Sequence, residues 1–181
     1  MNYEGQICRG PMERSSYMLP VAVGCSYNRC KFCTLFRHLK YRELPMEQIE
    51  AELERVRSLG GNPKHVFLGD GNAFGLATKR LLEITDLIHR YFPGCQAINM
   101  DGTITNIQAK SREELLALRK AGICHLYLGI ESGLDDVLRY MGKDHNLDQA
   151  YRQIDRIQRA GFMFDAHIMT GIAGHGRGLE N

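Results

Sequence analysis

The chain has 181 residues, of which 44% are hydrophobic and 24% charged, and its formal net charge at pH 7 is +2. This length and composition predict one globular domain with a core of its own, and the small charge gives no sign of nucleic-acid or anionic-membrane binding. The sequence has no apolar run of about eighteen residues that could span a membrane, and Met1 to Glu13 do not resemble a secretory signal. Six clustered cysteines in such a chain favour a reducing cytoplasm over a disulfide scaffold.

The N-terminal part predicts an irregular lead-in followed by a buried strand. Residues 1–17 are polar and contain Gly5, Gly10 and Pro11, and Cys8 among them is interpreted as a free thiol, with an extra metal ligand as the alternative. The apolar run from Met18 to Gly24 then predicts a first strand.

Three cysteines, Cys25, Cys30 and Cys33, follow that strand within one short loop. Thiolates at this density favour an Fe–S cluster or zinc over calcium or magnesium. A closed zinc site needs four ligands, and a cluster held by protein alone normally has four cysteines. Three local thiolates therefore suggest a cubane whose fourth iron is open, while zinc, another cluster type and free structural thiols are the alternatives.

The loop resembles the cluster-binding loop of the radical S-adenosylmethionine (radical SAM) enzymes, which is usually spaced Cys-x3-Cys-x2-Cys. Phe32, directly before the last cysteine, fits the aromatic position of that pattern, and one extra residue between Cys25 and Cys30 departs from it. The resemblance implies that Cys25, Cys30 and Cys33 bind a [4Fe-4S] cluster, that S-adenosylmethionine chelates the open iron, and that Phe32 belongs to the cofactor site.

The next segments predict a loop, a helix and a strand. Phe36 to Arg42 is basic and is interpreted as a solvated loop, with contact to an anionic substrate as the alternative. Apolar residues at steps of three and four after Pro45 predict an amphipathic helix that ends at Gly60-Gly61. His65 to Leu68 predicts the second strand.

A glycine-rich turn, Gly69 to Ala73, follows that second strand. Such a turn lets backbone approach a ligand closely, although a plain strand-to-helix turn is the simpler reading. Asp70, Gly71 and Asn72 are similar in position to the Gly-Gly-Glu segment of the family, which holds the amino group of the cofactor's methionine moiety. Asn72 offers only a carbonyl acceptor there, and Asp70 is the alternative source of a carboxylate.

Two more helices flank a third strand. A helix with apolar residues from Leu81 to Tyr91 precedes a strand from Cys95 to Met100, and Asp101 comes directly after it. Asp101 is interpreted either as a substrate contact or as an organiser of the turn. Ser111 and Glu114 form a predicted capping box for the following helix, which reaches Gly122.

The fourth strand, His125 to Ile130, leads into Glu131-Ser132-Gly133. This segment resembles the part of radical SAM proteins near the cofactor ribose, so Glu131 and Ser132 are expected there, with a helix cap at Ser132 as the alternative. Lys143 follows a short helix, and by the same resemblance it takes the place of an arginine that meets the cofactor carboxylate in coproporphyrinogen-dehydrogenase-like members.

A helix from Leu147 to Ala160 precedes the fifth strand, Phe162 to Thr170. The strand leads to Gly171, which resembles the family segment whose backbone lies along the adenine. His167 within the strand is interpreted as a core histidine.

Strand–helix alternation repeated five times predicts an α/β protein with parallel strands, either doubly wound or a (β/α) barrel. Ligand groups at the ends of several strands favour the barrel. The resemblance implies a partial (β/α) barrel of the radical SAM type over 18–174, ending after the fifth strand, with 1–17 as lead-in. The tail, 175–181, suggests a fragment of a longer chain or a barrel completed by another subunit.

The function implied by the resemblance is that of a radical SAM Fe–S oxidoreductase. Such an enzyme reductively cleaves S-adenosylmethionine to a 5′-deoxyadenosyl radical that abstracts hydrogen from a substrate, and it takes its electron from a flavodoxin- or ferredoxin-type donor. No catalytic residue is assigned beyond the cluster ligands, and the substrate is open. An Fe–S electron-transfer protein and a zinc-binding interaction module using His38 are the alternative functions.

Overall fold

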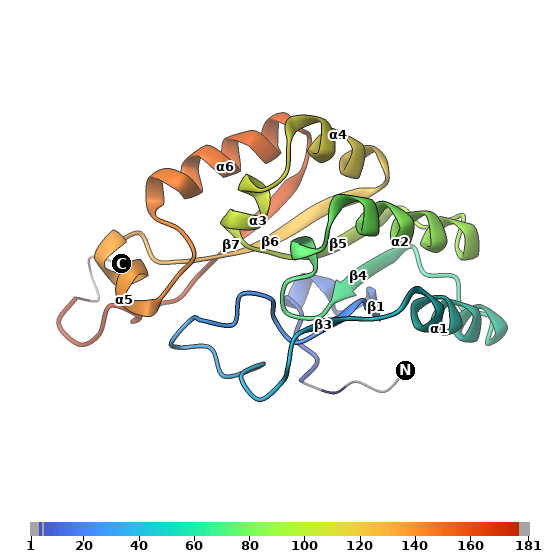
Figure 1. Cartoon of the computed structure of the whole chain (residues 1–181), viewed down its shortest axis with the longest axis horizontal. Coiled ribbons are helices and arrows are strands. Elements are labelled where there is room, and N and C mark those ends of the chain that lie inside the picture. Colours follow the sequence, from blue (N-terminus) through green and yellow to red (C-terminus); the bar gives the residue numbers. More distant parts are fainter. Residues whose placement is uncertain (1–3, 5, 178–181) are drawn as a thin grey trace.

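The computed structural model describes residue 4 and residues 6–177, and its centre is a parallel sheet. The five strands lie in the order β1-β4-β5-β6-β7, which follows their order in the chain (Figure 1). The sheet is therefore an open, partial (β/α) barrel in which β1 and β7 form the edges of the described part, and the predicted α/β class is confirmed. Its strands are β1 (Tyr17–Pro20), β4 (His65–Gly69), β5 (Ala97–Gly102), β6 (Ile123–Glu131) and β7 (Met163–Ile168).

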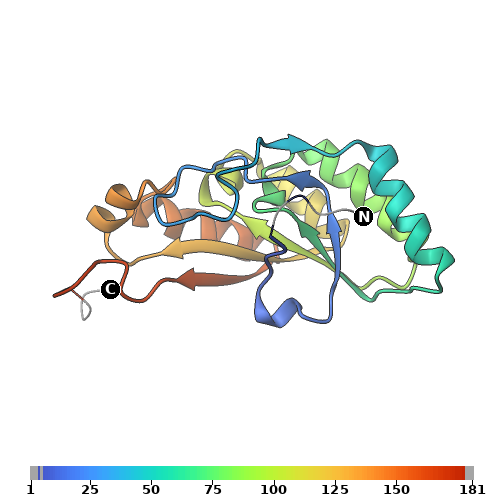
Figure 2. The same cartoon turned by 90° about the horizontal axis from the view of Figure 1, so that it is seen from below.

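Four longer helices cover one face of the sheet (Figure 1). The short helix η1 lies on the other face of the sheet, away from α1 and α2; it is the blue helical turn in Figure 2. None of the described helices is both long and apolar enough to cross a membrane. The longer helices are α1 (Met46–Ser58), α2 (Thr78–Tyr91), α4 (Arg112–Lys120) and α6 (Leu147–Arg159). The shorter ones are η1 (Pro11–Glu13), η2 (Ala73–Gly75), α3 (Ile104–Gln108) and α5 (Asp135–Met141).

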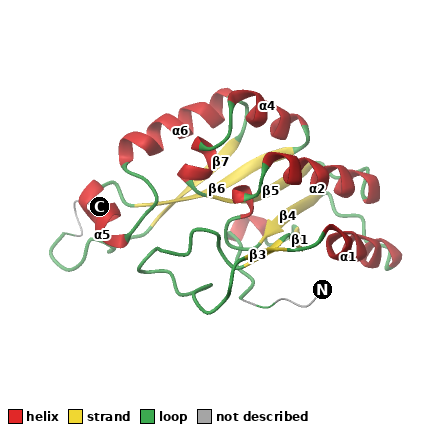
Figure 3. Cartoon of the chain, viewed as in Figure 1, coloured by secondary structure: helices red, strands yellow, loops and turns green. Residues whose placement is uncertain are grey.

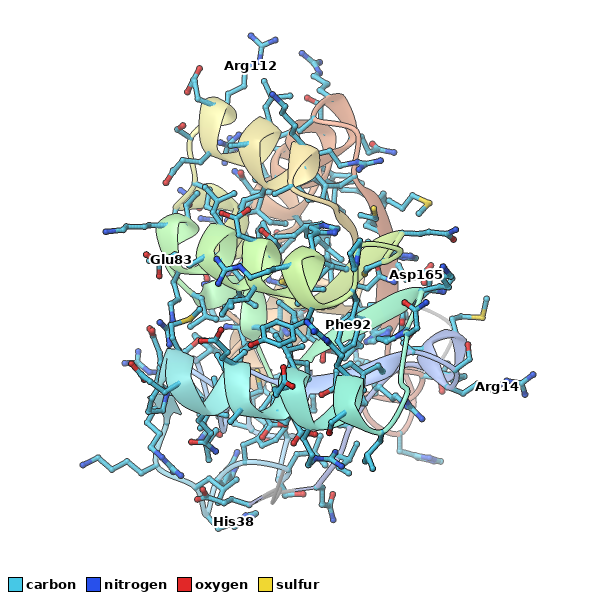
Figure 4. All side chains as sticks on the ribbon, turned by 90° about the vertical axis from the view of Figure 1, so that its right-hand side faces the viewer. Arg14, His38, Glu83, Phe92, Arg112 and Asp165 are labelled. Atoms are coloured by element: carbon cyan, nitrogen blue, oxygen red, sulfur yellow. The ribbon has the colours of Figure 1, made fainter. Side chains whose placement is uncertain are left out.

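The two faces of the sheet differ in chemistry because successive strand residues point to opposite sides. Leu68, Met100 and Leu128 are fully buried in the core between the sheet and the helices. Asp101 lies opposite Tyr127 in the register of β5 and β6, and both belong to the other, polar face. Figure 4 shows this division, with Glu83 on the helix side and Asp165 on the opposite side.

Most predicted elements are confirmed within a few residues. The capping box at Ser111 is present, since its hydroxyl accepts from the Glu114 amide and the Glu114 carboxylate accepts from the Ser111 amide. The predicted strand from Met18 to Gly24 instead splits into two, since β1 ends at Pro20, a residue that strands tolerate at their ends and on sheet edges. The second half, β2 (Ala22–Val23), pairs antiparallel with β3 (Arg42–Glu43).

Three expectations are corrected. The lead-in is not wholly irregular, because it contains η1 and buries Glu13. Helix α3 was not predicted, although its capping box of Thr103 and Asn106 is visible in the sequence. His167 is exposed rather than in the core, because it lies on the edge strand β7. Residues 1–3 and 5 of the predicted lead-in and 178–181 of the predicted tail lie outside the described residues.

Candidate cluster and cofactor site

The cysteine loop, residues 24–41, joins β2 to β3 and contains neither helix nor strand (Figure 3). Arg37 folds the loop back on itself, because its guanidinium donates to the carbonyl oxygens of Cys30 and Cys33, each at 2.7 Å. The Asn28 side chain also donates to the Phe36 carbonyl at 3.0 Å. The basic segment after Phe36 is solvent-exposed in the main, as predicted, but Arg37 also has this structural role.

The loop is attached to the C-terminal end of α5. The Tyr27 hydroxyl donates to the Gly142 carbonyl at 2.6 Å, and the Lys31 amide donates to the Met141 carbonyl at 2.8 Å. The Lys31 ammonium also lies 4.4 Å from the centroid of the Tyr140 ring. These contacts place the turn after α5 directly beside the cysteines.

A cavity of about 370 Å³ opens between this loop and the carboxyl ends of the strands. Seven of the eleven predicted site residues line it, and their roles there stay predictions. The seven that line it are Cys25, Cys30, Cys33, Phe32, Gly71, Glu131 and Lys143.

Two glycines allow the close packing around this cavity. A Cβ on Gly71 would lie 2.5 Å from the Phe36 ring and 3.0 Å from the Cys25 Cβ, so the turn after β4 meets the cysteine loop only because this residue is glycine. A Cβ on Gly129 would lie 2.4 Å from a Glu131 carboxylate oxygen and 3.1 Å from the Lys143 ammonium. Both positions therefore keep space open where predicted cofactor residues meet.

Glu131 and Lys143 form an ion pair at the wall of the cavity. Their charged atoms lie 3.5 Å apart, and the side chains are 12% and 5% exposed. The Lys143 ammonium is also 5.9 Å from the centroid of the Phe32 ring. Because this cation is held near the cysteines, it can attract an anionic ligand group without leaving its place.

Two thiols of the loop, Cys25 and Cys30, have raised pKa values and so favour the protonated form in the metal-free protein. Burial raises the pKa of Cys25 and of Cys30, and the positive charge of Lys143 acts in the opposite direction on both. Metal binding would therefore release protons from these thiols.

The remaining four predicted site residues do not line the cavity. Asn72 is 3% exposed and donates to the Ser26 hydroxyl at 2.8 Å, while Ser132 is fully buried and its hydroxyl accepts from the Leu134 amide at 3.1 Å. Asp70 is half-buried, and burial raises its pKa although the backbone amides of Gly24 and Gly71 hydrogen-bond to it. Gly171 is exposed, with no atom within 4 Å of the position of a Cβ.

Several cavity residues were not recognised from the sequence as site residues. Cys8, interpreted as an isolated thiol, lines the cavity, and its pKa is raised by burial and then by Asp101 and Cys33. Tyr127 and His167 also line it. No local pattern could have identified these three, because they enter the cavity through the folding of distant strands and of the lead-in.

The donor set fits a cluster with an open iron. Among the described residues, no three His, Cys, Asp or Glu side chains converge so as to share one metal ion. A cubane does not need that convergence, because each thiolate binds a different iron, whereas a zinc ion does. Three thiols around a cavity of this size therefore suit a cubane, and Cys25, Cys30 and Cys33 would hold it.

The sequence profile of the Radical SAM superfamily matches residues 19–177. The chain belongs to the radical SAM superfamily. Enzymes of this superfamily use a [4Fe-4S] cluster and S-adenosylmethionine, as the resemblance of the cysteine loop implied. The match covers the cysteine loop and all five strands of the sheet except the first residues of β1.

Similar proteins agree with this membership. The heme chaperone HemW of Bacillus subtilis is 25% identical over 153 residues, which are 83% of this radical SAM chain and 40% of HemW. The threonylcarbamoyladenosine tRNA methylthiotransferase MtaB of Thermotoga maritima is 26% identical over 172 residues, which are 90% of this chain and 38% of MtaB. The chain thus spans about two fifths of the length of these relatives.

The fold also matches a solved structure, that of coproporphyrinogen III oxidase (HemN) from Escherichia coli, described as a radical SAM enzyme. The TM-score is 0.64 at 14% identity, and the match covers 84% of this radical SAM chain and 36% of HemN. HemW and HemN together bear out the predicted likeness to the coproporphyrinogen-dehydrogenase-like members.

Proposed function

We propose that this chain is the cluster- and cofactor-binding part of a radical SAM enzyme. When bound, the cluster and S-adenosylmethionine supply reductive cleavage to a 5′-deoxyadenosyl radical, which abstracts hydrogen from the substrate. The observation that carries the proposal is the single cavity shared by the three cysteines, Gly71, Glu131 and Lys143, in a chain whose family uses these cofactors.

In this proposal Cys25, Cys30 and Cys33 each bind one iron, and Arg37 keeps the loop folded while they do so. Lys143 holds a positive charge for the cofactor carboxylate. Its partner Glu131 then becomes free to accept hydrogen bonds from the ribose hydroxyls. The walls of the cavity would limit the access of water to the radical on the side of the sheet and of the cysteine loop.

The other predicted residues have supporting places in the proposal. Gly71 lets the backbone after β4 come close to the methionine moiety, with Asp70 or Asn72 supplying the acceptor for its amino group. Ser132 orients the segment that carries Glu131, because it is buried and caps the turn. The Gly171 backbone would lie along the adenine, as the resemblance of its segment implies, at a position outside the lining of the cavity.

An electron donor of flavodoxin or ferredoxin type and a cytoplasmic location complete the proposal. The relatives do not identify the substrate, because one is named a heme chaperone and another a tRNA methylthiotransferase.

The test is electron paramagnetic resonance of the anaerobically reconstituted and reduced protein, recorded with and without S-adenosylmethionine. We expect a cubane signal whose shape changes when S-adenosylmethionine is added, because that ligand occupies the open iron. The variant Lys143→Ala should keep the cubane signal and need a higher concentration of S-adenosylmethionine for the same change.

Two outcomes would contradict the proposal. A cluster whose signal is indifferent to saturating S-adenosylmethionine would indicate an electron-transfer protein. A colourless protein with stoichiometric zinc would indicate a zinc module. Cys8→Ser is the matched control, because Cys8 lines the same cavity but is not expected to bind iron, so its cluster signal should be unchanged.

A further inference from the structure

The cavity continues beyond the cysteine loop onto the polar face of the sheet, where Cys8, Asp101, Tyr127 and His167 line it. These four residues are termed the recess. Asp101 pairs with Tyr127 in the register of β5 and β6, and His167 pairs with Gly129 in the register of β6 and β7. The recess is therefore built on three neighbouring strands and closed by the lead-in that carries Cys8.

Asp101 is the charged group of the recess that lacks a counter-ion. Within the described part of the chain its carboxylate accepts no hydrogen bond, and the charged groups that act on it are the carboxylates of Asp70 and Glu13. The two described cations that line the cavity are engaged elsewhere. Arg9 donates to the carbonyl oxygens of Ser16 and Arg14, and Lys143 pairs with Glu131.

A second acceptor lies below Asp101 on the same face of β5. Asn99 is 8% exposed, and its amide nitrogen donates to Glu13 at 2.7 Å, where the Tyr127 hydroxyl also donates at 2.7 Å. The Asn99 carbonyl oxygen is buried and has no hydrogen-bond donor among the described residues. A buried acceptor without a donor costs free energy, so this face of the sheet has acceptors and negative charge in excess of donors.

We propose that the recess binds a cationic nitrogen group of the substrate, an ammonium or guanidinium, through the Asp101 carboxylate. Such a group would supply the missing positive charge and donate hydrogen bonds to the Asp101 carboxylate, which lines the cavity. The inference rests on the proposed function in one respect, namely that the recess is where the substrate binds. It adds the chemical class of that substrate.

The charge of Asp101 makes this binding depend on pH. Burial, and after it the neighbouring carboxylates of Asp70 and Glu13, raise the pKa of Asp101 to about 7. The groups around it are those two carboxylates, from the turn after β4 and from η1, together with Cys8 of the lead-in, Tyr127 of β6 and His167 of β7. A cation binds the ionised form, so its affinity should rise about tenfold from pH 6 to pH 8.

The test compares two probes of nearly equal shape on the full 181-residue chain without cofactors, by fluorine nuclear magnetic resonance titration. The probes are 4-fluorobenzylamine, which is cationic, and 4-fluorobenzyl alcohol, which is neutral. At pH 8 we expect the amine to bind at least about tenfold more tightly than the alcohol. The Asp101→Asn variant should reduce this ratio to about one, because a neutral side chain no longer selects for charge.

Glu83→Gln is the matched control, because Glu83 is a partly exposed carboxylate on α2, on the opposite side of the sheet (Figure 4). It should keep the ratio of the wild-type protein. The pH series on the wild-type protein tests the inference without any substitution, should Asp101→Asn fail to fold.

Equal affinities for the two probes, an unchanged ratio in Asp101→Asn, or tighter binding of the anion 4-fluorobenzoate would each overturn the inference. The readout is independent of the cluster. If the protein prefers the amine but its cluster signal does not respond to S-adenosylmethionine, the inference about the recess stands and the proposed function is wrong. If the cluster signal responds but the protein does not prefer the amine, the proposed function stands and the inference about the recess is wrong.

Discussion

The two faces of the sheet differ in the interactions that their side chains make. On the helix side, side chains such as Leu68, Met100 and Leu128 are fully buried and contribute by the removal of apolar surface from water. On the other side, Glu13 and Asn99 are nearly as buried but are polar, and Asp101 has no counter-ion among the described residues.

This difference separates stability from function within one sheet. The apolar face is satisfied by its own packing, so its substitutions should change folding free energy and little else. The polar face has excess acceptors, and the cavity that continues from it is lined by the Cys25 thiol, whose pKa is raised by burial; a ligand or metal would satisfy both. We therefore expect substitutions there to change binding more than folding.

The largest expected effect is on the cysteine loop. Alanine at Cys25, Cys30 or Cys33 should each abolish cluster assembly, because a cubane held by two thiolates is not retained. Iron content and visible absorbance after anaerobic reconstitution measure this, and the thermal unfolding of the metal-free variants should stay near that of the parent. Cys124→Ala, at a buried thiol outside the cavity, is the control that should retain iron. A triple variant that kept its cluster spectrum would show the ligand assignment to be wrong.

The next effect lies on the apolar face. Leu68→Ala should lower the free energy of unfolding by about 2–5 kcal/mol, because it leaves a cavity in the core between sheet and helices. Urea unfolding monitored by circular dichroism gives the value. Met163→Ala on the edge strand β7, where the side chain is 58% exposed, should cost less than about 0.5 kcal/mol. Similar losses at both positions would contradict the division between the faces.

The third effect concerns pH and the polar face. Because the pKa of Asp101 is raised from 3.8 to about 7, the folded protein binds more protons than the unfolded chain between these values, and stability falls as pH rises through them. The loss from pH 5 to pH 8 should be at most about 3 kcal/mol. Asp101→Asn should remove this component, which is read as a flatter dependence of the unfolding midpoint on pH. A wild-type protein whose slope matches that of the variant would refute the prediction.

The smallest expected effect is on the stability of an exposed helix end on the apolar, helix-covered side of the sheet. Ser111→Ala should destabilise the protein by about 0.5–2 kcal/mol, because the first turn of α4 loses its cap. Chemical denaturation measures the loss, and Ser111→Thr should restore most of it. No change in probe binding at the recess is expected, since α4 packs on the helix side.

The helix side was largely predictable because its signals are local. Periodic apolar residues after Pro45 and the capping box at Ser111 each describe a structure within one turn or two. The cysteine loop was also visible, because its ligands lie in one short segment.

The polar face was less predictable because its contacts join distant parts of the chain. Glu13 accepts hydrogen bonds from Asn99 and Tyr127, which are 86 and 114 residues away. No spacing rule reports that the lead-in folds across the sheet and brings Cys8 to the cavity. His167 was misjudged for the related reason that an apolar strand pattern does not state whether the strand lies at an edge.

One of the hydrogen bonds between the cysteine loop and the end of α5 joins residues that are 115 positions apart, Tyr27 and Gly142. Because of this link, any order imposed on the loop extends to the turn that carries Lys143. Amide hydrogens at 140–145 should therefore exchange more slowly with solvent deuterium once the loop is loaded with metal, although none of these residues is expected to bind it. The loop and this turn would then open and close as one unit, so that loss of the metal also releases the cation intended for the cofactor.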